Sequence, residues 1–458
     1  MRLRLFSKFE FPKEHGARRN ALLRWAMIGS AVSKVSGLAL QAVSIPLVYH
    51  SLGQHRFALY LLLTAALGTI TLAQMGAGPG LIQGIAAANA LGKRDQETSL
   101  LNAAFRFTGL AALIGGVVII SIIHLVPIDR LFGAAFAHDR VETVSAANVC
   151  IVILIALMVS GVGDSALAGY QEQVFSFIGS LVANIASMSL LFFVCRHTPT
   201  LIDIILVLYG MPTLARVANL FALFRRRPYL LLGAFRSCRG FYATLFSVGL
   251  AFWTIEISGM IEQYSGTFIL ARLSSTHDTD LFAIVFKYLA LASMAVNVIT
   301  QPLWPAIADA IAHRDIDWIH RSYARIRHLL NIYSGLLAVL SISAGPWIFR
   351  HILHVDTTGY YALFLILGLF ALAHIRVHLL CVTMMGVQST WAVAAVLFSE
   401  NSLMAVFGVV LVPHLGAAGM ALAYLIANVA LPLWLLPRLM KRALQRISGG
   451  TQLAVEAC

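Results

Sequence analysis

Apolar stretches long enough to cross a lipid bilayer recur along the whole chain, and they constrain its fold more than any other feature. Of its 458 residues, 59% are hydrophobic and only 12% are charged, against roughly 25% charged in an ordinary soluble domain. In water, such a chain would leave much apolar surface exposed, whereas a span of about 20 apolar residues buries its whole circumference in lipid. The sequence therefore predicts an all-α integral membrane protein.

Twelve spans of this kind are predicted, and the loops between them hold most of the basic residues. With the N-terminus placed in the cytoplasm, the inner loops and tails contain 21 of the 33 Lys and Arg residues. Membrane insertion favours this bias, so both termini are expected in the cytoplasm. The net charge of +13 then reflects topology, and no nucleic acid partner is expected. The spans cover residues 21–50, 57–80, 102–126, 145–167, 174–195, 201–224, 241–271, 280–306, 328–350, 360–385, 390–412 and 416–437.

The chain also repeats itself weakly. Three short matches occur in the same order in both halves, and the separation between partners changes little from one match to the next. Ordered matches of this kind indicate an internal duplication. They pair Val35-Ser36-Gly37 and Gln41 with Ile257-Ser258-Gly259 and Gln263, Ala88-Asn89-Ala90 and Arg94-Asp95 with Ala308-Asp309-Ala310 and Arg314-Asp315, and Gly169, Gln171 and Asn184 with Gly386, Gln388 and Asn401.

The duplication predicts two lobes of six helices, separated by the densely basic stretch that follows the sixth span. Because six is even, both lobes cross the membrane in the same orientation, and we expect a pseudo-twofold axis along the membrane normal with a central cavity. Such an arrangement is typical of a transporter. The expected organisation is a basic cytoplasmic tail at 1–20, an N-lobe at 21–224, a cytoplasmic linker at 225–240, a C-lobe at 241–437 and a cytoplasmic tail at 438–458.

Three stretches resemble a known family of transporters. The first is similar to the loop that joins the first two helices of polysaccharide flippases, the second to the glycine-rich end of their second helix, and the third to the entry of their last helix pair. The stretches are Pro46–Gly53 with Phe57–Tyr60, Gly76–Gly84 with Ala86–Ala90 and Gly92-Lys93, and Leu411–Ala423.

The resemblance extends over most of the chain and is to the polysaccharide-transporter branch of the multidrug, oligosaccharidyl-lipid and polysaccharide exporter superfamily. It implies a flippase that moves undecaprenyl-diphosphate-linked oligosaccharides, such as O-antigen or exopolysaccharide units, across the bacterial inner membrane by alternating access. The implied protein is a transporter and not an enzyme, a monomer in the lipid bilayer, with the lipid-linked oligosaccharide and the polysaccharide polymerase machinery as partners. The chain lacks the two additional helices of lipid II flippases, as well as the acidic first-helix site and the glutamine-rich second-helix pattern of drug–cation antiporters.

Charged side chains within the spans are the candidates for function, because each costs at least about 2.5–3.5 kcal/mol at the bilayer centre. Lys34 shares a helical face with Gln41, and the repeat places Glu256 and Gln263 at the corresponding positions of the second half. We expect both faces to line the cavity, with Lys34 contacting the substrate diphosphate in the inward-open state and pairing with Glu256 on closure. A buried structural ion pair, or snorkelling of Lys34 to the inner interface, remains the alternative.

Further charges lie in the second half. Arg376 and Lys287 are cationic groups suited to phosphate or acidic sugars, although Lys287 is also placed to snorkel to the outer face. Glu256, Glu262 and Glu400 are candidates for binding a coupling proton, and Glu400 is alternatively a structural partner of Arg376. The simpler alternative for Glu262 is a hydrogen bond between helices.

Two features concern the helices themselves. Pro302 and Pro305 are expected to kink the eighth span, either as a hinge or as its end, and the glycines that follow Gln74 are expected to do the same in the second span. Arg106 and Arg216 lie near the cytoplasmic ends of their spans and are expected to snorkel.

No catalytic or metal-binding motif occurs in the sequence, and no cofactor is expected. The five cysteines show no paired spacing, which argues against disulfides and zinc. Without a nucleotide-binding motif, transport is expected to use ion coupling or facilitated exchange. The alternatives are a drug or small-molecule antiporter of the same superfamily and a membrane-embedded glycosyltransferase or glycan ligase, but the longest outer loop, about residues 127–144, is too short for a catalytic domain.

Overall fold

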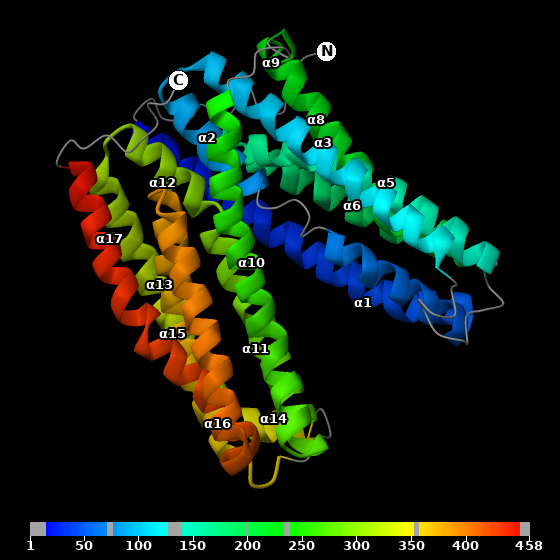
Figure 1. Ribbon diagram of the computed structural model, residues 1–458, viewed down its shortest axis with the longest axis vertical. Helices are drawn as coiled ribbons and strands as arrows, with labels where there is room; N and C mark the ends of the chain where they lie inside the picture. The colour runs from blue at the N-terminus through cyan, green and yellow to red at the C-terminus, as the bar shows by residue number, and fades with distance from the viewer. Residues whose placement is uncertain are drawn as a thin grey trace. The chain divides into compact units, whose positions relative to one another are not determined.

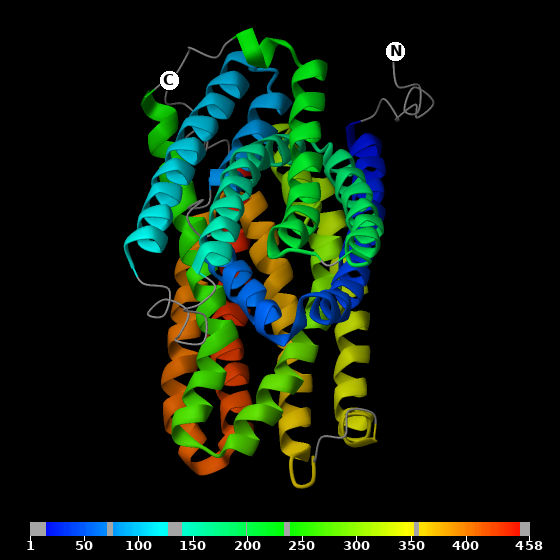
Figure 2. The ribbon, with the colours of Figure 1, turned by 90° about the vertical axis from the view of Figure 1, so that its right-hand side faces the viewer.

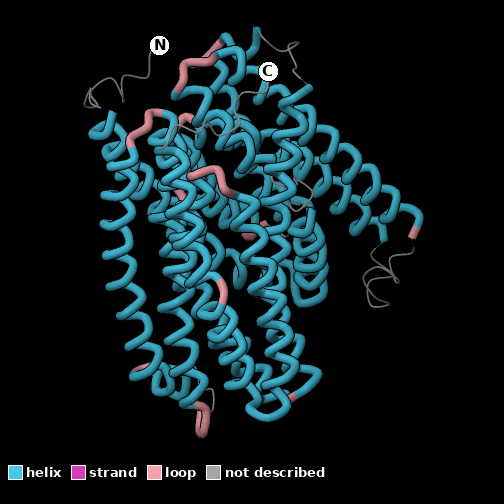
Figure 3. The backbone as a smooth tube through the Cα atoms, turned by 60° about the vertical axis from the view of Figure 1, so that its left-hand side comes forward, coloured by secondary structure: helices cyan, strands magenta, loops and turns pink. Residues whose placement is uncertain are grey.

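The computed structural model describes residues 15–70, 77–126, 140–197, 199–232, 239–351 and 357–448. Every regular element within these ranges is a helix, and no strand occurs among them (Figure 3). The all-α prediction is confirmed. The chain divides into two compact units, Met1–Gly249 and Leu250–Ala457, which are described separately below. The predicted lobe and linker limits stay predictions, and residues 233–238 of the linker lie outside the described ranges.

Unit 1 is built around α5, which packs against α2, α3 and α8, while α6 packs against α1 and α8 (Figures 1 and 2). Its largest fully buried side chains are aliphatic and include Leu81, Ile85 and Leu101. The elements are α1 (His15–Ile70), α2 (Ala77–Ala90), α3 (Arg94–Leu125), α5 (Arg140–Gly169), α6 (Gln173–Val194), α7 (Leu201–Ile205), η3 (Leu206–Gly210), α8 (Met211–Arg226) and α9 (Tyr229–Leu232).

Unit 2 is built around α15, which packs against α11, α12, α13, α16 and α17 (Figure 1). Aromatic side chains fill its core, where Phe282, Phe286, Phe370 and Tyr424 form a cluster of ring contacts. The elements are α10 (Arg239–Leu273), which begins in unit 1, α11 (Thr276–Thr300), α12 (Leu303–Ala312), α13 (Ile316–Ser343), α14 (Gly345–His351), α15 (Tyr361–Gly386), α16 (Thr390–Ala430) and α17 (Pro432–Ser448).

Nine helical stretches of the described residues are long and apolar enough to cross a membrane, so the chain is a multi-pass membrane protein. The predicted count of twelve stays a prediction. Predicted span 57–80 is divided between α1 and α2, and residues 71–76 between them lie outside the described ranges. Predicted spans 390–412 and 416–437 lie in the continuous run Thr390–Ile447.

The duplication is visible in the helix ends. At the end of α5, Glu172 N–H bonds the Leu167 carbonyl, and Gln171 takes a left-handed φ of 59°. At the end of α15, Ser389 N–H bonds the Met384 carbonyl, and Gln388 has φ of 60°. Both are helix-terminating turns of the same type, and the sequence match had paired Gln171 with Gln388.

A second pair of turns corrects the register of the repeat. After α2, Lys93 N–H bonds the Ala88 carbonyl, and after α12, Asp315 N–H bonds the Ala310 carbonyl. The turns therefore make Lys93 equivalent to Asp315, whereas the sequence match had paired Asp95 with Asp315. The sequence match between Arg94-Asp95 and Arg314-Asp315 is therefore shifted along the chain relative to the residues that occupy equivalent positions in the two turns.

Helix packing repeats as well. A Cβ atom at Gly169 would lie 2.7 Å from Cβ of Ile85, and one at Gly386 would lie 2.7 Å from Cβ of Ile307. Glycine at these two positions lets α5 approach α2 in unit 1 and lets α15 approach α12 in unit 2. A further matched residue, Asn184, donates to Ser36 Oγ at 2.9 Å, as its counterpart in unit 2 donates to a serine carbonyl in α10 at 2.9 Å.

The backbone conformation explains why one of the motif positions, residue 416, is a glycine. Gly416 divides α16 into two helices with φ 53° and ψ −134°, a conformation that only glycine adopts readily. A Cβ atom there would lie 2.6 Å from Asp278 Oδ2, which comes from the start of α11. The resemblance in residues 411–423 thus reflects a tight helix junction.

Candidate functional site

Lys34 lies in the middle of α1 and is half-buried. Within the described ranges it has no hydrogen bond or ion pair to another side chain. The hydroxyl of Ser30, one turn earlier, is fully buried and also has no hydrogen-bond partner there. Gln41, on the predicted face with Lys34, is exposed. Lys34 is thus a half-buried cation that no described side chain neutralises.

A charged network that the sequence analysis missed lies between α5, α6 and α8. Asp164 Oδ1 accepts hydrogen bonds from Ser176 at 2.8 Å and from Asn219 at 3.0 Å, and Asp164 Oδ2 lies 3.4 Å from Nε of Arg216. Arg216 Nη1 also donates to the Leu157 carbonyl at 3.4 Å. Arg216 was expected to snorkel, but it is held by an acid inside unit 1. The missed signal was Asp164, an acid within an otherwise apolar span.

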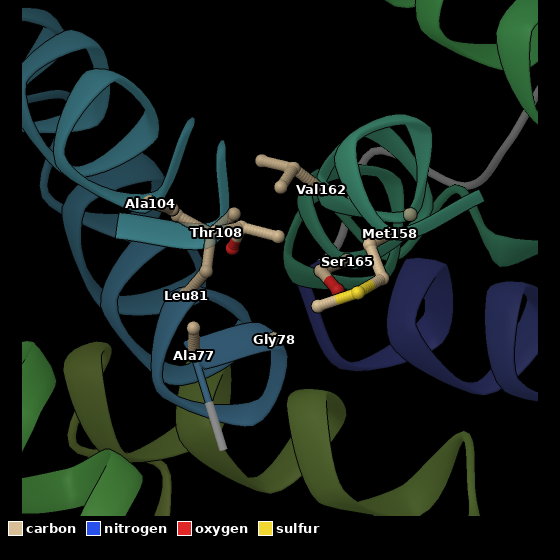
Figure 4. A pocket seen from close by; sticks show the side chains of 9 residues that line it. Ala77, Gly78, Leu81, Ala104, Thr108, Met158, Val162 and Ser165 are labelled. Carbon is tan, nitrogen blue, oxygen red and sulfur yellow. The ribbon is translucent and has the colours of Figure 1, made fainter. Parts of the chain in front are cut away.

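A small cavity lies beside this network, between α2, α3 and α5 (Figure 4). Its volume is about 20 Å³, enough for one water molecule. The hydroxyls of Thr108 and Ser165 line it together with Gly78 and Gly161. A Cβ atom at Gly161 would lie 3.4 Å from Arg216 Nη1, so the cavity and the charged network adjoin.

Unit 2 has larger side chains at the positions that correspond to two glycines of this cavity. When the equivalence of the two pairs of turns is carried back along the helices, Gly78 corresponds to Thr300 and Gly161 to His378. Thr300 Oγ1 and His378 Nε2 are 3.0 Å apart and hydrogen-bonded. The backbones of the two units therefore correspond here, but unit 1 has two glycines where unit 2 has a hydroxyl and an imidazole side chain.

The predicted cations of unit 2 are exposed. Arg376, on α15, donates from Nε to Asn331 Oδ1 on α13 at 3.1 Å. Lys287 on α11, like Glu256 and Gln263 on α10, is exposed and bonds to no other described side chain. None of the predicted site residues of unit 2 contacts another one through a hydrogen bond or ion pair among the described residues. Their proposed roles stay predictions.

Glu400 is buried, with 6% of its surface exposed, and accepts a hydrogen bond from Asn428 Nδ2 at 2.6 Å. Among the described residues no ion pair joins Glu400 to Arg376, which donates to Asn331 instead. The Asn428 Oδ1 atom is buried and has no partner among the described residues. Glu262 is close enough to Glu400 to interact electrostatically, and its carboxylate lies 3.5 Å from His374 Nδ1.

Glu262 was expected to contact a neighbouring helix, and its partly exposed carboxylate faces His374 on α15. The carboxylates of Glu262 and Glu400 and the free oxygen of Asn428 form a polar site within unit 2. Among the described residues, no group of three His, Cys, Asp or Glu side chains is placed to hold a metal ion.

The prolines of the eighth predicted span mark an interruption. α11 ends at Thr300, Pro302 is the N-cap of α12, and Pro305 is buried within the first turn of α12. A hinge role for Pro302 and Pro305 stays a prediction. Gln74 and Gly76 of the matching segment lie outside the described residues, and Gly84 packs against Leu100 of α3.

The start of the predicted linker is fastened to unit 1 by five residues, called here the linker cluster: Glu97, Tyr170, Glu172, Arg227 and Tyr229. Glu97 is buried and accepts from the Tyr170 phenol at 2.8 Å and from the Tyr229 phenol at 2.5 Å. Arg227 forms a two-point ion pair with Glu172, at 2.8 and 3.2 Å, and its guanidinium lies 3.7 Å from the Tyr170 ring centre.

The electrostatics of the linker cluster follow from burial and charge. Burial raises the pKa of Tyr170 and of Tyr229, and the neighbouring Glu97 carboxylate raises both further. Burial by itself would lower the pKa of Arg227, but the hydrogen bonds to Glu172, the Glu172 charge and the interactions with Tyr170 and Tyr229 together outweigh it and raise that pKa. The cluster holds two phenols against one carboxylate and ties three segments of unit 1 together.

The cysteines do not form a site within the described ranges, where Cys150, Cys195 and Cys381 are free thiols. Cys238 and Cys458 lie outside those ranges.

Solved structures with the same fold are membrane transporters. A transporter of the MOP superfamily from Pyrococcus furiosus is 11% identical, with a TM-score of 0.75 over 95% of this chain and 97% of that one. A MATE transporter in a bent conformation is 13% identical, with a TM-score of 0.78 over 95% and 97%. The Vibrio cholerae MATE transporter VcmN, in a variant form, is 14% identical with a TM-score of 0.71 over 94% and 98%.

Comparison by sequence identifies the family. No curated protein matches the chain by sequence. The family model described as "Polysaccharide biosynthesis protein" matches residues 27–311, which is more than half of the chain. The fold is the one seen in solved transporters of the MOP superfamily. The chain belongs to the polysaccharide biosynthesis protein family and has the fold of these membrane transporters.

Proposed function

We propose that this chain is a flippase that moves an undecaprenyl-diphosphate-linked oligosaccharide, an O-antigen or exopolysaccharide unit, across the bacterial inner membrane by alternating access. One observation carries the proposal within the family: the half-buried Lys34, which no described side chain neutralises. An unpaired intramembrane cation is costly, and an anionic substrate would compensate for that cost. The diphosphate would meet Lys34, while the polyprenyl tail stays in lipid.

Arg376 and Lys287 supply further positive charge in unit 2. Arg376 uses Nε for Asn331, so its terminal amino groups remain able to donate to phosphate or to an acidic sugar. Gln41 and Gln263 are exposed and would hydrogen-bond sugar hydroxyls. Pro302 and Pro305, at the interruption between α11 and α12, would serve as the hinge of this unit.

The coupling step is assigned to the carboxylates of unit 2. Glu400 is buried beside the unpartnered Asn428 oxygen, and the second carboxylate, Glu262, lies near it. A charged carboxylate at the buried Glu400 is costly within the membrane, and proton binding at Glu400 would relieve that cost. Glu256 is the exposed alternative on α10.

The test of the substrate site is a cell-based export assay. We expect Lys34→Ala to abolish surface polysaccharide and to cause lipid-linked oligosaccharide to accumulate, at unchanged protein level, with partial activity in Lys34→Arg. The matched control is Arg24→Ala, which removes an exposed cation from the same helix and should leave export unchanged. Full export by Lys34→Ala would overturn the assignment of Lys34.

The same strains separate the flippase from the drug antiporter. Loss of surface polysaccharide with unchanged drug tolerance supports the flippase, whereas drug sensitivity with normal polysaccharide supports the antiporter.

A separate experiment tests the coupling role of Glu400. The variant Glu400→Gln keeps the hydrogen bond with Asn428 but cannot release a proton. We expect this variant to bind substrate and to lose the dependence of flipping on a pH gradient in proteoliposomes. An unchanged pH-gradient response would exclude Glu400 from coupling.

A further inference from the structure

The C-terminal helix α17 differs from the spans before it because its polar and apolar faces are sharply separated. Arg438, Lys441, Arg442 and Arg446 are all exposed, and the helix contains no acidic residue. On an ideal helix, these four residues lie within an arc of about 140°. They are called the basic face of α17.

The opposite side of α17 is fixed in unit 2. Leu436 is fully buried and Leu444 is 6% exposed, and Leu439 and Met440 pack against the apolar cluster formed with α15 and α16. Because this side is packed, the helix cannot rotate its basic face away from its surroundings. The orientation of the four cations is therefore determined by the core of unit 2.

The basic face has no partner within the protein as described. None of its four residues forms an ion pair or hydrogen bond with another described residue. Three more exposed arginines lie on α13, which shares the same apolar cluster through Tyr323. These are Arg321, Arg325 and Arg327. Both α13 and α17 pack against α15, so exposed cations occur on two helices of unit 2.

We propose that the basic face of α17 binds the headgroups of anionic phospholipids. The four cations are spread over a helix length of about 12 Å, which suits several singly charged headgroups better than one compact diphosphate. The exposed Trp434, 61% accessible, lies one turn before Arg438, where an interfacial aromatic is expected. A cluster of at least four Lys and Arg residues beside a membrane helix is typical of contact with anionic lipid headgroups. The proposal does not depend on the transported substrate.

The experiment uses purified full-length protein in mixed detergent micelles, titrated with dioleoylphosphatidylglycerol or with dioleoylphosphatidylcholine, with bound lipid counted by native mass spectrometry. Each basic residue near an anionic surface contributes about fivefold to affinity. We therefore expect two double variants, Arg438→Gln with Arg442→Gln and Lys441→Gln with Arg446→Gln, each to weaken phosphatidylglycerol binding by about tenfold or more. Phosphatidylcholine binding should not change.

The matched control exchanges the cations without changing charge: Arg438→Lys, Lys441→Arg, Arg442→Lys and Arg446→Lys together. This variant should bind phosphatidylglycerol like the original protein. Unchanged phosphatidylglycerol affinity in both double variants, at an unchanged melting temperature, would overturn the proposal. Preferential binding of geranylgeranyl diphosphate over phosphatidylglycerol, lost in the double variants, would also overturn it, because the face would then bind a diphosphate.

Discussion

The linker cluster illustrates what single side chains decide in this protein. Glu97 is buried, and its charge is tolerated because two phenols donate to the same carboxylate oxygen, Oε2. Tyr170 comes from the turn after α5 and Tyr229 from α9, so three separate segments meet at one carboxylate. The cluster thereby fixes the first residues of the predicted linker to unit 1.

The titration of the two phenols gives a pH prediction. Their pKa values are raised in the folded protein, so their contribution to stability is complete below the unfolded pKa of about 10 and is lost as the pH rises through the folded values. We expect the melting temperature in detergent to be level between about pH 8 and 9.5 and to fall at higher pH. Circular dichroism during heating measures this dependence.

The control for this prediction removes the titrating groups. Tyr170→Phe combined with Tyr229→Phe should reduce the fall above about pH 10, at the cost of a lower melting temperature at neutral pH. Tyr264→Phe, which changes a phenol that is 65% exposed, should leave the dependence unchanged. A double variant with the same alkaline slope as the original protein would show that these phenols are not its source.

Among elements, the two helix crossings at Gly169 and Gly386 are the clearest sign of the duplication. In each, a carbonyl oxygen also lies near the position of a Cβ atom, at 3.0 Å from Ile82 in unit 1 and at 3.1 Å from Trp304 in unit 2. The neighbouring backbone cannot move as easily as a side chain tip. The close approach of these helices therefore depends on glycine at both positions.

Substitution at these crossings should cost a similar amount in both units. We expect Gly169→Ala and Gly386→Ala each to reduce the free energy of unfolding by about 1–3 kcal/mol, because overpacking forces the helices apart. Thermal unfolding in detergent measures the effect. Gly109→Ala is the matched control: a Cβ atom there has no atom within 4 Å, so stability should be unchanged or slightly higher. Equal stability of all three variants would contradict the crossing argument.

At the scale of the whole molecule, the relation between the two units is a prediction from the duplication. Lys34 and Glu256 occupy corresponding positions of the repeat with opposite charge. The sequence predicts that they pair when the cavity closes. Breaking this pair is expected to affect transport more than stability, because the pair would form in only one state of the transport cycle.

Charge reversal tests this pairing. We expect Lys34→Glu and Glu256→Lys separately to reduce polysaccharide export by at least about tenfold, and the double variant to recover part of it, since the pair then has its charges exchanged. Full recovery is not expected, because Lys34 is also assigned to the substrate. Export in the double variant no higher than in the weaker single variant would argue against direct pairing.

A structural property can be predicted from the sequence when its physical cause acts within a single segment of the chain. The cost of placing apolar residues in water acts on each segment separately, so the helical class, the membrane location and the anomaly of Lys34 were all predictable. The register of the second repeat match was not, because Arg-Asp pairs in two turns look alike by residue type. Only the turn hydrogen bonds of Lys93 and Asp315 show the correct equivalence.

The sequence by itself determined an all-helical, duplicated membrane protein and the charges that such a protein must accommodate, because burial in lipid restricts each span independently. Only the tertiary structure decided which charges are paired. Arg216 on α8 meets Asp164 on α5, and Glu400 meets Asn428 while Arg376 meets Asn331. Such pairings depend on how helices distant in sequence pack against one another, and residue type and spacing do not specify that packing.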